Sequence, residues 1–483
     1  MNFKKILCMS LAVLSVFAST VTVGAQEAEV IEDEAVLAED AELFAIKEVT
    51  SGVIIYECDT TKKTATAIGV TDAAKGVNIP ATVKSGSTEC KVTAIADGFC
   101  SGNEKIETVS FTGATNLTTI GENCFSYCPQ LYTVSFLASK SKLESIGNNS
   151  FYYCQKLQNI VNLDAQNLTE VGSSVFGLTP FMDAKTEEFV MFGDVLVKYN
   201  GSSKNVKVPT GTVAVADAFF GKDIESIDFG TKLETVGNNA FYGCRNLKSV
   251  KLPASCTKVG DMAFAGCTAL ESVEYAGKLA SIGFCSFANC SNLTSFKYTG
   301  TGSSTLTAIG ECAFWNDRKL AYLDAGTIVN VNVGSFWNCF GDTPEAMYYY
   351  RIPNTVKTIA EGGYGNLWFT YVTVPESVEA LASTAFGSTS GATYIVRKGS
   401  VADKYFEGSG YSYIHYGDMN GDGKINAKDF QTIANYLAQG INNLNYNYGA
   451  GVIIDGDGDG EISMKDLNDI FKSIKADYEA ENK

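Results

Sequence analysis

The fold is decided by three consecutive stretches that share one pattern: VGNNAFYGCRNLKSVKL (residues 236–252), VGDMAFAGCTALESVEY (residues 259–275) and IGFCSFANCSNLTSFKY (residues 282–298). Each begins with an aliphatic residue, and then places Phe, Cys and Leu at the same offsets before an alternating apolar run. Self-similarity at a step of 23 residues indicates a solenoid, in which each repeat buries its apolar face against its neighbours.

Weaker copies extend the array in both directions and start at Ile95, Ile120, Ile146, Val171, Val215, Ile309, Val331, Ile359 and Leu381. A longer step, from Val171 to Val215, contains an inserted stretch at residues 189–209. The run that ends each copy alternates apolar and polar residues, so we expect one rung of a parallel sheet per turn. The repeat Phe and Cys are expected to fill the same core layer in every turn.

This spacing resembles the BspA-like subclass of bacterial leucine-rich repeats. The resemblance implies an N-terminal cap at residues 50–94 and a leucine-rich-repeat β-solenoid with a parallel sheet of about a dozen turns at residues 95–416, including its closing turn. It also implies a surface for binding or adhesion, with no chemistry attached.

The cysteines follow the repeat. Six of them occupy one column: Cys128, Cys154, Cys244, Cys267, Cys290 and Cys339. Stacked side chains point the same way and stay about 4.8 Å apart, beyond the usual Cβ separation of a disulfide, so we expect buried thiols. Cys285 and Cys312, at matching positions of adjacent turns, are the best candidates for an exception.

Charge and composition exclude several functions. The formal charge of -17 argues against nucleic acid or an anionic membrane surface as the partner. A single histidine, His415, makes histidine-dependent catalysis or a histidine-rich zinc site improbable. We expect it to be a boundary residue between the last turn and the C-terminal module.

The N-terminal end has the pattern of a secreted chain. Residues 1–25 combine Lys4 and Lys5, an apolar run and the small residues Gly24 and Ala25, which is typical of a signal peptide. Residues 26–49 are strongly acidic and are expected to form a disordered leader. No later apolar run has the length of a membrane span.

Two exposed surfaces are candidates for ligand binding. The outward strand positions are small and polar, which fits either a hydrogen-bonding surface for protein or glycan or a plain solvated sheet face. Trp315 and Trp337 follow the repeat Phe in successive turns. They could form a stacked platform for sugars, or could instead pack against the next loop.

Residues 417–483 contain two acidic loops that predict calcium sites. Oxygen side chains recur at alternate positions around a glycine turn, and such carboxylates and amides converge on a hard cation. Two Ca²⁺ ions are therefore expected, with Lys424 and Glu461 contributing backbone carbonyls. The ligands of the first loop are Asp418, Asn420, Asp422, Lys424, Asn426 and Asp429, and those of the second are Asp455, Asp457, Asp459, Glu461, Ser463 and Asp466.

The loops differ from a full EF-hand. Position 12 is Asp rather than Glu, and no helix is expected before either loop, whereas a helical run follows each of them at residues 430–437 and 467–474. Paired loop–helix units of this kind resemble a small all-α, two-calcium dockerin domain. The resemblance implies calcium-dependent docking onto a cohesin module of a scaffoldin, in a cell-surface complex that degrades plant polysaccharides. The family's recognition positions correspond here to Ala427, Lys428, Met464 and Lys465.

Together these features predict a secreted, non-catalytic binding or adhesion protein, monomeric outside its complex, that a dockerin anchors into a cellulosome-type assembly. The repeats would bind a protein or a glycan. The alternative is a polysaccharide-degrading enzyme of glycoside hydrolase type in the same complex. The repeats leave no stretch of typical catalytic-domain size, and no carboxylate pair at a set separation is recognisable among them.

Overall fold

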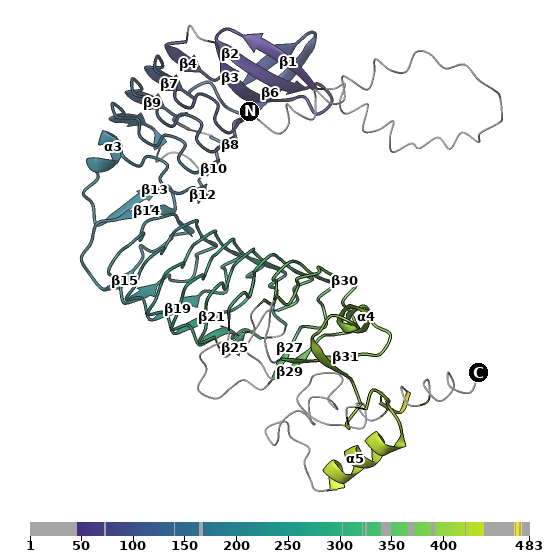
Figure 1. Cartoon of the computed structure of the whole chain (residues 1–483). Helices are drawn as coiled ribbons and strands as arrows, with labels where there is room; N and C mark the ends of the chain where they lie inside the picture. The colour runs from purple at the N-terminus through teal and green to yellow at the C-terminus, as the bar shows by residue number, and fades with distance from the viewer. Residues whose placement is uncertain are drawn as a thin grey trace, which may run out of the picture. The chain divides into compact units, whose positions relative to one another are not determined.

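The structure is a computed structural model. It describes residues 46–483 apart from 72–73, 140, 164–167, 302, 321, 324–325, 340–348, 366–370, 388–391, 421, 439–467, 469, 473–474 and 476–483. Within the described residues the chain forms a parallel β-solenoid of about 14 turns with few helices, so the predicted fold class is confirmed (Figure 1).

The N-terminal part is built from two hairpins. Strand β2 pairs antiparallel with β3, and β5 pairs antiparallel with β6, while β3 and β6 run parallel to each other. The first strand begins four residues before the predicted cap at residues 50–94. The strands are β1 (Ile46–Ser51), β2 (Ile54–Asp59), β3 (Thr64–Val70), β5 (Thr82–Ser85) and β6 (Thr88–Ile95).

The expected ladder consists of the strands at the end of each repeat, which pair in parallel with strands of adjacent turns in separate sheets that end at β11, β17 and β25. In β19, for example, Val250 and Leu252 are buried and Ser249 and Lys251 are exposed, as the alternating pattern predicts. The strands are β4 (Gly76–Asn78), β7 (Thr108–Ser110), β9 (Thr133–Ser135), β11 (Asn159–Val161), β17 (Ser226–Asp228), β19 (Ser249–Leu252), β21 (Ser272–Tyr275), β23 (Ser295–Tyr298), β25 (Tyr322–Leu323), β27 (Tyr349–Arg351), β29 (Tyr371–Thr373), β31 (Thr393–Val396) and β32 (Ser412–His415).

A second ladder, which the repeat pattern did not predict, lies where each repeat starts. Its strands are only two residues long and also pair in parallel with strands of adjacent turns, in sheets that end at β12 and at β24. They are β8 (Thr119–Ile120), β10 (Ser145–Ile146), β12 (Glu170–Val171), β16 (Ala214–Val215), β18 (Thr235–Val236), β20 (Lys258–Val259), β22 (Ser281–Ile282), β24 (Ala308–Ile309), β26 (Asn330–Val331), β28 (Thr358–Ile359) and β30 (Ala380–Leu381).

The repeat Phe residues form two runs of stacked rings in the core, one before and one after the inserted hairpin. The ring of Phe241, for example, lies 5.0 Å from those of both Phe219 and Phe264, with interplanar angles of 7° and 4°. All three side chains are fully buried. Because each ring packs between two others, a single turn cannot complete this core, which explains why the fold needs a stack of repeats.

The cysteine column is buried as predicted, and it has a bonding pattern of its own. Except for Cys128, each thiol of the column donates to the carbonyl of the repeat Phe in the preceding turn, as Cys244 Sγ does to Phe219 O (3.0 Å) and Cys267 Sγ to Phe241 O (3.1 Å). Burial raises the pKa of Cys244 to about 12. All thirteen described cysteines are free thiols, and only Cys285 and Cys312 among them are partly exposed.

The inserted stretch forms a hairpin that joins the stack. Strand β13 (Phe189–Phe192) pairs antiparallel with β14 (Val195–Tyr199), which pairs parallel with β16. Strand β15 (Asn205–Lys207) pairs with β17, and helix α3 (Pro180–Asp183) precedes the hairpin. Thr179 caps α3 by accepting a hydrogen bond from the Met182 amide (3.2 Å).

Helix α4 (Val401–Phe406) closes the array. His415, on β32, places Nε2 2.8 Å from Asp403 Oδ1 on α4, so the single histidine ties the closing helix to the last strand. In the described part of the chain no helix combines the length and apolar character that crossing a membrane requires.

Candidate calcium and partner-binding site

The first acidic loop follows the last strand without a linker. The amide of Tyr416 still donates to Val396 O (2.8 Å) in the ladder, and Gly417 then turns the chain with φ +90°. Asp418 begins the loop, and helix α5 (Ala427–Ala438) begins near its end. An extended segment before the loop and a helix after it agree with the prediction.

The two terminal carboxylates of this loop are buried and bonded to its backbone. Asp418 is 2% exposed, and its Oδ2 accepts a hydrogen bond from the Gly423 amide (2.8 Å). Asp429 is fully buried, and its Oδ1 accepts from Met419 N (2.9 Å) while its Oδ2 accepts from Asn426 N (2.8 Å). Asp429 thus reaches back across the whole loop and closes it.

Three hydrogen bonds between residues two positions apart turn the chain between Asp418 and Asp429. Asn420 Oδ1 accepts from Asp422 N (2.8 Å), Asp422 Oδ1 from Lys424 N (2.9 Å), and Asn426 Oδ1 from Lys428 N (2.9 Å). Gly423 has φ +78°, a conformation that glycine adopts without strain. These bonds fold the described residues between Asp418 and Asp429 into one turn, and their role as ligands of a single ion stays a prediction.

This donor set fits Ca²⁺. It consists of oxygen atoms only, it includes two carboxylates withdrawn from solvent, and a hard cation prefers such ligands. Among the described residues no three Asp, Glu, Cys or His side chains gather closely enough to hold a metal by themselves. The amide oxygens of Asn420 and Asn426 and the carbonyl of Lys424 would therefore have to complete the shell.

The second loop lies outside the described residues, and with it the predicted ligands Asp455, Asp457, Asp459, Glu461, Ser463 and Asp466 and the recognition residues Met464 and Lys465. The recognition residues of the first loop are described. Ala427 and Lys428 lie at the start of α5 and are exposed, so a partner can reach them. Their assignment as contact residues stays a prediction.

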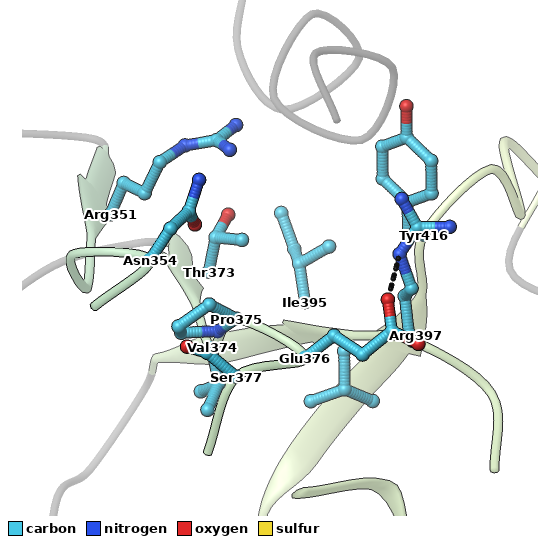
Figure 2. Close-up of a pocket in the computed structure, with 11 residues that line it drawn as sticks. Arg351, Asn354, Thr373, Val374, Pro375, Glu376, Ser377, Ile395, Arg397 and Tyr416 are labelled. Atoms are coloured by element: carbon cyan, nitrogen blue, oxygen red, sulfur yellow. Dashed lines mark ion pairs between the residues drawn. The ribbon is translucent and has the colours of Figure 1, made fainter. Parts of the chain in front are cut away.

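The loop and its helices share a small core with the last turns of the solenoid, which the sequence analysis missed. Ile395 of β31 and Ile433 of α5 are fully buried, and Tyr416 and Ile425 are 5% exposed. Ile470 is fully buried in the same cluster. The guanidinium of Arg397 lies 4.9 Å from the Tyr416 ring, and its Nε is 3.2 Å from Glu376 Oε2. Ile395, Arg397, Glu376 and Tyr416 are among the residues that line a cavity of about 250 Å³ (Figure 2).

The two tryptophans of the predicted pair differ in their exposure to solvent. Trp337 is partly buried. Its ring lies against Gly365 of the next turn, where an added Cβ would come within 2.2 Å of its Cε3 atom. A Cβ on Gly387 would lie 3.3 Å from its Cζ3 atom. Trp315 is 39% exposed. Trp337 therefore packs against the following turns, while a role of the pair in sugar binding stays a prediction.

Fold and site together define a class: a repeat solenoid that ends in a calcium-type loop module. Comparison with protein families agrees. The BspA type leucine rich repeat region matches residues 81–190, 214–343 and 338–408, and the dockerin type I domain matches residues 416–474. The chain therefore belongs to the BspA-type leucine-rich-repeat proteins and carries a C-terminal dockerin domain. Neither matched region is a catalytic domain.

Solved structures similar to this chain are leucine-rich-repeat proteins of low sequence identity. A leucine-rich cell surface protein of Faecalibacterium prausnitzii is 21% identical over 74% of this chain and 96% of its own, with a TM-score of 0.31. A leucine-rich repeat protein of Bacteroides ovatus is 19% identical over 76% and 100%, with a TM-score of 0.39. The pneumococcal vaccine antigen PcpA is 13% identical over 76% and 98%, with a TM-score of 0.31. No curated protein matches the chain.

Proposed function

We propose that this protein is a secreted, non-catalytic binding component of a cellulosome-type, polysaccharide-degrading complex. Its dockerin docks with two bound Ca²⁺ ions onto a cohesin module of a scaffoldin. Its leucine-rich repeats present a surface that binds a protein or a glycan. The observation that carries the proposal is the first loop, where buried Asp418 and Asp429 fix an oxygen-lined turn and leave Ala427 and Lys428 exposed.

Calcium would act by allowing the loop carboxylates to lie together. Like charges about 4 Å apart repel by roughly 4 kcal/mol per pair at an effective dielectric constant of 20. Bound Ca²⁺ would remove this repulsion, and its binding free energy would then contribute to the folding of the module. Asp418, Asn420, Asp422, Asn426 and Asp429 would hold the ion in the first loop.

Calorimetric titration of the full chain with a panel of cohesin modules tests this function. We expect binding in millimolar CaCl₂, no binding in EDTA, and no binding by the Asp418→Ala, Asp429→Ala double variant. Asp228→Ala, a change on an exposed strand of the solenoid, is the matched control. Binding that survives both EDTA and the double variant would refute calcium-dependent docking.

Both loops carry Lys at the second recognition position, so we further propose that the module binds its cohesin in either of two orientations. Lys428→Glu or Lys465→Glu alone should then leave one orientation and reduce affinity little, whereas the two changes together should abolish binding. A single change with the full effect of the double one would contradict the dual mode.

The enzyme alternative is tested separately. Incubation of the purified chain with a panel of plant polysaccharides should release no reducing sugar. Release that disappears on replacing one carboxylate would overturn the non-catalytic assignment.

A further inference from the structure

One position of the repeat has left-handed backbone in nine turns. It is the second residue after the repeat Phe. In the later turns it is Gly or Asn, namely Gly221, Gly243, Gly266, Asn289, Asn316 and Asn338, with φ between 58° and 72°. These two residue types tolerate left-handed φ best. The local geometry of the solenoid therefore selects for them.

Three earlier turns have a large side chain at this left-handed position instead of Gly or Asn. Tyr127, Tyr153 and Leu178 occupy the same position with φ of 56°, 59° and 55°. A bulky residue in this region is a genuine conformational outlier, because its Cβ approaches the neighbouring backbone. An outlier of this kind is a reason to look for a function of the side chain.

Core packing does not account for these residues. Tyr127, Tyr153 and Leu178 are 53%, 38% and 56% exposed, so their side chains do not fill the solenoid interior. The tyrosines gather with each other instead. The Tyr127 ring centroid lies 5.7 Å from that of Tyr152 and 5.3 Å from that of Tyr153. The strained positions thus expose two aromatic rings, those of Tyr127 and Tyr153, and the aliphatic side chain of Leu178 to solvent.

The exposed rings continue beyond the inserted hairpin. Phe220 and Tyr242 follow the repeat Phe of the next two turns, are 55% and 39% exposed, and stack at 5.1 Å with an interplanar angle of 11°. We call Tyr127, Tyr152, Tyr153, Leu178, Phe220 and Tyr242 the exposed ridge. Gly177 and Phe220 line one common groove, and a Cβ placed on Gly177 would lie 3.1 Å from Cδ2 of Tyr152, so this groove lies between the two halves of the ridge.

Two grooves with hydrogen-bonding groups accompany the ridge. The groove between Gly177 and Phe220 encloses about 250 Å³ and is lined by Lys198, Asp217 and Lys222. A second groove of about 450 Å³ beside Phe220 and Tyr242 is lined by Lys222, Asp223, Arg245 and Asn246. The first exists because hairpin β13–β14 replaces a regular turn between β12 and β16.

We propose that the exposed ridge and its two grooves bind a polysaccharide chain. A pyranose ring has an apolar face of C–H groups and a rim of hydroxyls, so it fits an aromatic side chain flanked by charged and amide groups. A row of large side chains contributed by successive turns suits an extended, repeating ligand. A stable protein interface needs about 800 Å² per partner, a broader patch than a single row of side chains. The site deepens the proposed function, because it assigns the repeats a glycan ligand, but it does not depend on the dockerin.

The column itself supplies the variants that test the site. Tyr127→Asn, Tyr153→Asn and Leu178→Asn introduce the residue that Asn289, Asn316 and Asn338 already provide in other turns. The triple variant should therefore fold, with a melting temperature equal to or above that of the wild type. A second variant, Phe220→Ala with Tyr242→Ala, removes the other half of the ridge. Tyr132→Ala is the control, since Tyr132 is 42% exposed but outside the ridge.

The readouts are pull-down on insoluble polysaccharides and affinity electrophoresis in soluble ones, with neutral glucans and xylans in one arm and polyuronates in the other. We expect the wild type and Tyr132→Ala to bind in at least one arm. Each ridge variant should bind at least tenfold more weakly, without a loss of melting temperature. Cohesin binding, measured in parallel, should be unchanged, which separates this site from the dockerin.

Three results would overturn the proposal. The first is a wild type that neither arm retains, including one that captures only a protein. The second is retention by both ridge variants equal to that of the wild type. The third is a melting temperature that falls in the Asn triple variant, because the three residues would then be structural.

Discussion

Asp317 occupies the cysteine column of its turn and gives a sharp prediction about stability and pH. Its carboxyl group is fully buried between the turns of Cys290 and Cys339. Oδ1 accepts a hydrogen bond from the Cys290 amide (2.7 Å), whereas Oδ2 has no hydrogen-bond partner within the described structure. Replacing Asp317 by Cys would restore the residue that neighbouring turns carry and would offer a thiol to the Phe287 carbonyl.

The size of the effect on the free energy of unfolding follows from the protonation of the Asp317 carboxyl group. Burial raises the pKa of Asp317 well above its ordinary value of 3.8, although the Cys290 amide acts in the opposite direction. Above that ordinary value the unfolded chain releases the proton and the folded chain keeps it. The free energy of unfolding therefore falls as pH rises, by about 1.4 kcal/mol per pH unit while the folded carboxyl stays protonated. Over two pH units the loss is about 2.7 kcal/mol.

Urea unfolding of the wild type, Asp317→Cys and Asp317→Asn at pH 5, 6 and 7 measures this effect. Both variants should be more stable than the wild type at pH 7, and the difference should shrink toward pH 5. The pKa of Asp217 is also raised, chiefly by burial, but Asp217 is present in all three proteins and cancels in the difference. A stability difference that does not change with pH, or variants less stable than the wild type at pH 7, would refute the reasoning.

Three further predictions concern the repeat. Phe241→Ala leaves a void between two stacked rings and should lower the free energy of unfolding by about 3–5 kcal/mol in urea titrations; an unchanged midpoint would mean that the stack is not continuous. Gly260→Ala places a Cβ 2.5 Å from Asn238 Oδ1 and 2.7 Å from Asn238 N, and should cost about 1–3 kcal/mol, whereas Gly69→Ala, with 3.9 Å to its nearest atom, should cost less than half as much. Of the thirteen described cysteines, a thiol reagent should modify only the partly exposed Cys285 and Cys312 in the native protein. It should reach the buried thiols only in denaturant, and rapid native modification of more than two would contradict their burial.

The repeat register was predictable because its residues recur for a physical reason. The repeat positions of Phe241 and Cys244 fill the same core layer from turn to turn, so the same residue spacing recurs along the chain. The two-residue strands of the second ladder were not predictable, because two residues show no alternation. The left-handed column was hidden as well. Tyr127 and Gly243 both stand two residues after the repeat Phe, but Tyr127 shares no chemistry with Gly243, and only the backbone angle shows that this position is left-handed.

Some features of the candidate sites were also predictable from the sequence, and others were not. Asp418 and Asp429 are recognisable because calcium chemistry fixes the type and spacing of its ligands. The groove beside Phe220 is not, because it depends on where hairpin β13–β14 joins the stack. The position of a residue within a repeat can be predicted from the local sequence. The place where hairpin β13–β14 joins the repeats depends instead on contacts between residues far apart in the chain.

The end of the solenoid shows how one strand can serve both modules. Strands such as β19 and β21 alternate, but β31 has consecutive buried residues, with Tyr394 and Val396 in the solenoid core and Ile395 in the cluster that contains Ile425 and Ile433. A strand apolar on both faces must be covered on both faces. The calcium loop and α5 supply that cover, so whatever folds the loop also shields Ile395 from solvent. Calcium binding should therefore stabilise the closing turn as well as the dockerin, because a ligand that binds only the folded state stabilises every contact that forms with it.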